Sequence, residues 1–401
     1  MRARTPSSSL LLAISALCLT ALAATPVHAE PPGAVRQALQ PLPAPAAPGP
    51  AIARRPLIQV AVLLDTSNSM DGLIAQAKAE LWRIVNEIAA YKKNGQDPEV
   101  HVALIEYGKQ SLPAGEGFMR IVVPFTAELD RVSEALFALQ TNGGDEYCGQ
   151  AIDMAVDALQ WSREPDDFRS IFIAGNEPFT QGRVDFRFAI GKARKAGIAV
   201  NTIHCGGLDE GIRGAWRDGA DLGQGSYMAI AQNDQQVNIA TPYDAEISQL
   251  GQQLNDTYVG YGRKGESAKM RQAVQDNNAA AVGGSTAVER SLTKSKASVY
   301  ANEDWDLVDA KKKGKADLKA MAPAALPAEM QKMNEGEREA FVEKKAKDRE
   351  EIQAKLTSLD AKRKKFIADE QKKGSGKEKN TFDAAMRKAL KSQLEARKFA
   401  Q

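Results

Sequence analysis

The chain has 401 residues, with 53 Lys and Arg against 51 Asp and Glu, so its formal net charge is +2. No stretch after residue 29 is apolar enough to cross a bilayer, which argues against an integral membrane protein. The charge is unevenly placed, because residues 307–401 hold 25 Lys and Arg but 16 Asp and Glu. We expect this basic tail to meet an anionic surface or to fold back on the acidic remainder of the chain.

The first 29 residues have the order of a secretory signal. Arg2 and Arg4 precede an apolar run at 10–24, and the small-residue pattern Val27-His28-Ala29 follows. This pattern predicts cleavage after Ala29 and a soluble mature chain that is periplasmic or secreted. Residues 30–56 are rich in Pro and Ala and are expected to form a flexible leader.

From residue 57 to about 262, apolar strand patterns alternate with amphipathic helix patterns. Such alternation predicts an α/β domain of the Rossmann-like, doubly wound kind, with a mainly parallel sheet covered on both faces. About 200 residues suffice for one such domain. The expected strands are 57–64, 100–107, 118–123, 168–174, 198–205 and one near 227. One expected helix begins near 70, and the others cover 130–139, 149–161, 186–196, the surroundings of 216, and 244–258.

The remaining residues differ in composition. Residues 263–325 contain an Asn, Ala and Gly stretch and a lysine run, which indicate a flexible linker with a local anchor at 305–307. Residues 326–401 are expected to form a charged helical tail. A thin apolar stripe follows its first helix, but Arg349 and Arg363 interrupt the seam, and glycines at 374 and 376 break the helix. We therefore expect a helical hairpin rather than a long coiled coil.

Two cysteines remain after the expected cleavage, Cys148 and Cys205. In an oxidising compartment an even pair favours a disulfide. One starts a helix and the other follows a strand, both near the same edge of the sheet, so a bridge is expected in preference to two free thiols. Neither has the spacing of a zinc site.

The most informative motif, Asp65-Thr66-Ser67-Asn68-Ser69, lies where the first strand ends. A carboxylate and two hydroxyls at alternate positions direct their oxygens to one point. The carboxyl end of a buried strand is where open α/β sheets bind ligands, and oxygen ligands suit a hard ion such as Mg²⁺ or Ca²⁺. The alternative interpretation is that Ser67 and Ser69 cap the following helix.

This Asp-x-Ser-x-Ser pattern after a hydrophobic strand resembles the metal-ion-dependent adhesion site of von Willebrand factor type A domains. The resemblance covers residues 57–262, about half of the chain. Residues 172–179 and 241–244 also resemble stretches of exported bacterial proteins that join such a domain to a charged helical tail.

The resemblance implies further ligands from two other loops. In the loop before the third helix, Asp145 or Glu146 brings a carboxylate where many relatives place a threonine. The family often shows an Asp-Gly pair at the end of the fourth strand, but here Gly175 stands in the aspartate position. The expected replacement ligand is Asn176 through its carbonyl oxygen, or Glu177 indirectly.

In this family the ion keeps an open coordination position that a carboxylate of a partner fills. The resemblance therefore implies a non-enzymatic binding module with a bound Mg²⁺ or Ca²⁺ and a protein partner that presents an acidic side chain. Nucleic acid is not an expected partner, because no aromatic side chains are interleaved among the tail lysines. Contact between the tail and anionic envelope components is the more natural expectation.

Two other functions stay open at this point. The protein could be an envelope scaffold that acts through its basic tail, with a degenerate metal site. It could also be a hydrolase that uses Ser67 or Ser69 with His204, although no Gly-x-Ser-x-Gly elbow surrounds either serine. The other mature histidine, His101, alternates with apolar neighbours and is expected to be structural. The phosphate-binding and dinucleotide-binding motifs are absent.

Overall fold

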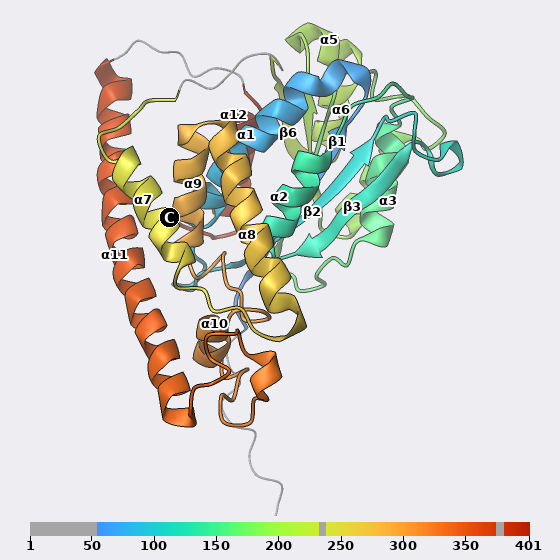
Figure 1. The fold of residues 1–401 in the computed structure, drawn as a ribbon. Coiled ribbons are helices and arrows are strands. Elements are labelled where there is room, and N and C mark those ends of the chain that lie inside the picture. Colours follow the sequence, from blue (N-terminus) through green and yellow to red (C-terminus); the bar gives the residue numbers. More distant parts are fainter. Residues whose placement is uncertain (1–53, 232–237, 374–380) are drawn as a thin grey trace, which may run out of the picture. The chain divides into compact units, whose positions relative to one another are not determined.

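A six-stranded sheet forms the centre of the protein in the computed structural model, which describes residues 54–231, 238–373 and 381–401 (Figure 1). The strand order is β3-β2-β1-β4-β5-β6; β3 is antiparallel to β2, and the other neighbours are parallel. The strands are β1 (Leu57–Asp65), β2 (Glu99–Tyr107), β3 (Met119–Thr126), β4 (Phe168–Gly175), β5 (Ala199–His204) and β6 (Gln224–Ala229). The expected α/β fold is therefore confirmed.

The central strands are apolar along most of their length because helices bury both faces of the sheet. One face carries α3 (Cys148–Ala158), α4 (Phe186–Lys195) and α6 (Trp216–Leu222). The opposite face carries α1 (Asp71–Ile88), α2 (Leu129–Ala138) and α12 (Phe382–Ala396). The short helix α5 (Leu208–Arg213) contacts α6 and β6.

The last helix, α12, completes the cover of the sheet although it comes from the far end of the sequence. It packs on α1, β5 and β6 (Figure 1). Its apolar side enters the same core as the strands through Phe382, Met386, Leu390 and Leu394. The domain that begins at β1 is therefore not complete at residue 262.

The stretch 263–325, expected to be a flexible linker, instead contains two long helices and a short one. These are α8 (Gly262–Val282), α9 (Gly284–Lys294) and α10 (Leu307–Lys312). Helix α8 packs on α2 and α9, and α9 packs on α1 and on α7 (Asp244–Asn255).

The expectation was wrong for a physical reason, because the buried side of α8 consists of small residues and two glutamines and has no large apolar side chain. Gln275 Oε1 accepts a hydrogen bond from Ser133 across 2.8 Å, and Gln272 Nε2 lies 3.2 Å from the Tyr300 hydroxyl. Arg290 of α9 is buried and ion-paired with Asp130 at 2.6 Å. Helix packing through amides and ion pairs leaves little apolar periodicity to detect in the sequence.

The two described helices of the tail do not pack together as the expected helical hairpin. Helix α11 (Glu335–Lys373) packs on α7, α9 and α10, whereas α12 packs on α1 and the sheet. In Figure 1, α11 runs along α7 at the outer side of the molecule. The expected signal at residues 1–29 and most of the leader lie outside the described residues.

Candidate functional site

The candidate site begins at the carboxyl end of β1, where Asp65 is the last strand residue and is fully buried. Its Oδ1 accepts the backbone N–H of Ser67 at 2.7 Å, a turn that Asp commonly makes two residues on. Its Oδ2 is buried and has no hydrogen-bond partner among the described residues. The strand thus directs a buried carboxylate toward the loops, where Glu146 lies close enough to act on it.

Backbone hydrogen bonds hold the neighbouring loops at this edge. The Thr66 N–H donates to the Tyr107 carbonyl at the end of β2, at 2.8 Å. The Asn142 N–H donates to the Thr66 carbonyl at 2.9 Å, which ties the loop before α3 to the loop after β1. The residues after β1, those after β2 and the loop before α3 therefore form one connected set.

The side chains of Ser67, Ser69 and Asn176 lie close together. The hydroxyls of Ser67 and Ser69 are 3.2 Å apart. The Ser69 hydroxyl donates to Asn176 Oδ1, just after β4, across 3.4 Å. Neither serine caps the following helix through its side chain. Their oxygens remain on the site side of the loop.

Of the two acids in the loop before α3, the structure brings Glu146 to the site and leaves Asp145 outside it. Glu146 is buried, and its Oε2 has no hydrogen-bond partner among the described residues. Asp145 is exposed and accepts a hydrogen bond from the Tyr147 hydroxyl at 2.9 Å. The sequence could not decide between Asp145 and Glu146 as the carboxylate of the site, because the path of the glycine-containing loop determines which of the two side chains points inward.

Two glycines make room for the acids. Gly108, with φ of +78°, would place a Cβ 2.6 Å from Asp65 Oδ1 and 2.9 Å from Glu146 Cγ. At Gly175 a Cβ would lie 2.5 Å from the Tyr107 hydroxyl oxygen and 3.1 Å from Asp65 Oδ2. Any side chain at either position would displace the carboxylates or the tyrosine. Gly175 therefore stands in the aspartate position because Tyr107 fills the space beside it.

Tyr107 and Gly108 are the residues that the sequence reasoning missed. The Tyr107 hydroxyl donates to the Ala174 carbonyl at 2.9 Å and so fixes the end of β4. A usable signal was present, because these residues follow an apolar strand that is parallel to β1. Residues at the ends of neighbouring parallel strands share one edge of the sheet.

The buried acids make the site electrostatically unfavourable when both are ionised. Burial raises the pKa of Asp65 well above its usual range, and the nearby Glu146 charge raises it further. Burial also raises the pKa of Glu146. A positive charge between them would offset both effects, because an opposite charge favours the ionised form.

The donor set fits a hard divalent ion. Two carboxylates with unpaired buried oxygens, two hydroxyls and one amide oxygen converge there, and Mg²⁺ and Ca²⁺ prefer oxygen ligands. No group of three or more His, Cys, Asp or Glu suited to a metal occurs among the described residues. Any ion held here would therefore depend on hydroxyl and amide oxygens in addition to Asp65 and Glu146. Glu177 is exposed, and its carboxylate accepts from Gln181 instead.

The serines do not contact either histidine through a hydrogen bond. His204 is buried against Trp216, with ring centroids 5.6 Å apart, and burial lowers its pKa. Neither ring nitrogen is hydrogen-bonded to any described residue, and Glu210 lies 3.9 Å away. His101 pairs with Glu99 at 2.7 Å at the start of β2, at the opposite end of that strand.

The expected disulfide is wrong, because Cys148 and Cys205 are both free and buried. Cys148 packs in the core on the α3 and α4 face of the sheet, with its Sγ 3.7 Å from the Tyr107 hydroxyl. Cys205 packs in the core on the opposite face. The sheet separates the thiols although both lie near its same edge. A shared position near one edge of the sheet does not determine the face of the sheet to which each cysteine side chain points.

Among the described residues, none of the helices has the length and apolar character needed to span a bilayer.

Three of the solved structures that are similar to this chain illustrate the likeness. The SpRpn10 VWA domain is 18% identical, with a TM-score of 0.35, covering 45% of this chain and 90% of that one. BatB from Bacteroides thetaiotaomicron is 18% identical, with a TM-score of 0.33, covering 43% and 90%. An aerotolerance-related membrane protein from Bacteroides fragilis NCTC 9343 is 16% identical, with a TM-score of 0.30, covering 44% and 93%.

None of the curated proteins matches this chain in sequence. The family model for the von Willebrand factor type A domain matches residues 59–244. This range begins in β1 and ends at the first residue of α7, and so contains the sheet, except for the first two residues of β1, and the candidate site. Residues 59–244 therefore form a von Willebrand factor type A domain, a member of a family of protein-interaction modules.

Proposed function

We propose that this protein is a non-enzymatic binding module that engages a partner protein through a divalent cation held at the carboxyl edge of its sheet. One observation carries the proposal: the carboxylates of Asp65 and Glu146 are buried close to each other, in a cluster whose polar atoms are all oxygens. An unpaired buried carboxylate is costly unless a cation or a proton neutralises it.

The residues that would hold the ion are Asp65, Ser67, Ser69, Glu146 and Asn176. When bound, Mg²⁺ or Ca²⁺ supplies an open coordination position for an acidic oxygen of the partner. Asp65 and Glu146 provide the negative charge, and the two hydroxyls and the amide provide neutral oxygens. Gly108 and Gly175 keep the space beside the carboxylates free.

The setting of the proposal is the bacterial cell envelope, periplasmic or secreted, as the signal-like residues 1–29 predict. Recovering the protein from a periplasmic or culture fraction with Glu30 as its first residue would support this setting. A protein that stays in the cytoplasm with residue 1 or 2 at its amino terminus would contradict it.

The test of the cation site is thermal unfolding of the full chain with Mg²⁺, Ca²⁺ or Mn²⁺ against a chelator. A cation at 100 times its Kd stabilises the folded state by about 2.7 kcal/mol, which raises Tm by several degrees. Asp65→Ala should abolish this rise. An unchanged Tm of the wild-type chain at millimolar cation would overturn the proposal.

The scaffold alternative treats the tail as a separate interaction module, but the tail helices are part of the folded body. Helix α12 belongs to the core of the sheet, and buried ion pairs hold α11. Deleting residues 307–401 would therefore damage the domain itself and would not separate the two functions. Substitutions of exposed side chains can separate cation-dependent binding from binding through the tail without removing packed helices.

A further inference from the structure

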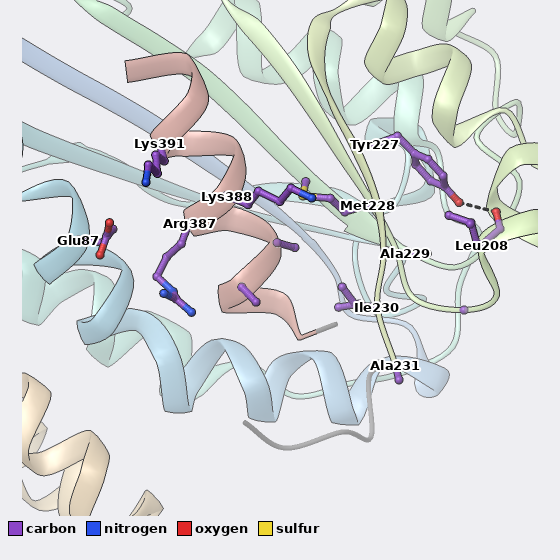
Figure 2. Close-up of a pocket in the computed structure, with 13 residues that line it drawn as sticks. Glu87, Leu208, Tyr227, Met228, Ala229, Ile230, Ala231, Arg387, Lys388 and Lys391 are labelled. Carbon is purple, nitrogen blue, oxygen red and sulfur yellow. Dashed lines mark hydrogen bonds between the residues drawn. The ribbon is translucent and has the colours of Figure 1, made fainter. Parts of the chain in front are cut away.

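A groove of about 810 Å³ runs between the edge strand β6 and helix α12, and none of the residues proposed to hold the cation lines it. Figure 2 shows Met228 and Ile230 on the strand side and Arg387, Lys388 and Lys391 on the helix side. The groove exists only because α12 packs beside β6, so neither the domain nor the tail would form it alone.

The helix side of the groove is positively charged. Lys388 and Lys391 are exposed, lie one helical turn apart, and have no carboxylate in ion-pair distance among the described residues. In Figure 2, Lys388 extends toward Met228. Arg387 is 3.3 Å from Asp383, and the acid at the rim, Glu87, accepts a hydrogen bond from Gln401 at 2.9 Å. The groove therefore favours an anionic occupant.

The strand side of the groove is an open sheet edge. β6 is the last strand in the order, and it pairs with β5 alone among the described strands. The Ile230 N–H donates to the His204 carbonyl of β5 at 2.8 Å. Because the backbone groups of successive strand residues alternate in direction, those of Tyr227 and Ala229 face away from β5. An open edge of this kind can pair with an added strand.

We propose that this groove binds an extended, acidic segment of a partner protein, which adds to the sheet along β6. Every second side chain of an added strand lies on the same face, about 6.6–6.8 Å apart. An acid on the side of the added strand that faces α12 therefore meets Lys388, which extends toward β6, and Lys391 adds positive charge elsewhere in the groove.

A peptide fits the groove better than a simple polyanion does. The lining includes the apolar residues Met228, Ile230, Ala384 and Ala385, which a phosphate or sulfate chain would leave unused. Backbone donors and acceptors on β6 are likewise matched only by another peptide backbone. This second surface goes beyond the proposed function and requires no cation.

The test measures fluorescence anisotropy of a labelled ten-residue peptide that alternates Glu and Thr, titrated with the full chain. The test variant is the double charge reversal Lys388→Glu with Lys391→Glu. The matched control is Lys344→Glu with Lys347→Glu, two exposed lysines at the same spacing on α11 that also have no ion-pair partner among the described residues. All four lysines are exposed, so both variants should fold, and circular dichroism checks this.

We expect the test variant to weaken binding by about tenfold or more and the control by less than about twofold. A second peptide, N-methylated at alternate residues, keeps its charge but loses the N–H groups along one edge, and it should bind at least about tenfold more weakly. Equal weakening by both protein variants, or undiminished binding of the methylated peptide, would overturn the proposal and indicate a general polyanion surface. A chelator should leave the binding unchanged, so this result and the cation result can fail independently.

Discussion

Arg363 on α11 donates its Nη1 to Glu289 Oε1 on α9 across 2.9 Å, and both side chains are buried. Arg349, 14 residues earlier on the same side of α11, makes a matching contact with buried Asp306 at 2.8 Å. Its guanidinium also lies 4.1 Å from the centre of the Tyr258 ring. These arginines interrupt the apolar stripe of α11 in the sequence, but they are the residues that fix the helix to the body.

Removing either arginine should destabilise the protein strongly. Arg363→Ala leaves Glu289 buried without its charge partner, which costs about 3–5 kcal/mol in comparable cases. Lys362→Ala, at the exposed neighbouring position, should change the free energy of unfolding by less than about 0.5 kcal/mol. Urea denaturation compares the variants, and equal stabilities would show that α11 is held by its apolar contacts alone.

A fragment restricted to residues 57–262 should not fold to a native state. It lacks α12 and α9, both of which pack on α1, so buried residues such as Trp82 and Ile88 would be exposed. We expect dye binding typical of exposed apolar surface and no cooperative thermal transition. A fragment with a sharp transition would contradict the placement of α12 in the core.

Glu80 on α1 should make stability depend on pH. Burial raises its pKa from 4.5 to about 7, with Asp383 and Glu289 adding to the rise and Arg83 and Arg387 opposing it. The folded state therefore keeps a proton that the unfolded chain releases above pH 4.5. Stability from this group is present at low pH and is lost as the pH rises from about 4.5 to 7.

Glu80→Gln, which stays neutral, should remove this dependence. The difference in the free energy of unfolding between Glu80→Gln and the wild-type chain should shift in favour of the variant by up to about 3 kcal/mol between pH 4.5 and pH 8. Denaturation at both pH values measures the double difference, which cancels the other titrating groups. If the variant and the wild-type chain differ in stability by the same amount at both pH values, the pKa of Glu80 is not raised in the folded state.

The parts predicted from the sequence are those with local or periodic signals. The apolar strands ending at Asp65 and Gly175 predicted the sheet, and the pattern of Asp65, Ser67 and Ser69, with Asn176 after another strand, predicted side chains at one edge of that sheet. Strand ends are reliable because parallel strands place their carboxyl ends at one edge.

The parts that could not be predicted depend on long-range packing. The buried side of α8 has little apolar periodicity, because it is made of small residues and of two glutamines, Gln272 and Gln275, that form hydrogen bonds with residues far away in sequence. The faces occupied by Cys148 and Cys205 follow from side-chain direction at the ends of different elements. The inward turn of Glu146, and not Asp145, follows from the path of its loop.

The most direct test of the central claim is calorimetric titration of Mg²⁺, Ca²⁺ or Mn²⁺ into the full chain and two adjacent variants. Glu146→Gln changes the acid that the structure places in the site, and Asp145→Asn changes its exposed neighbour. We predict one ion per wild-type chain, the same affinity in Asp145→Asn, and an affinity lowered by about tenfold or more in Glu146→Gln. No binding to the wild-type chain, or equal loss in both variants, would contradict a cation site built on Asp65 and Glu146.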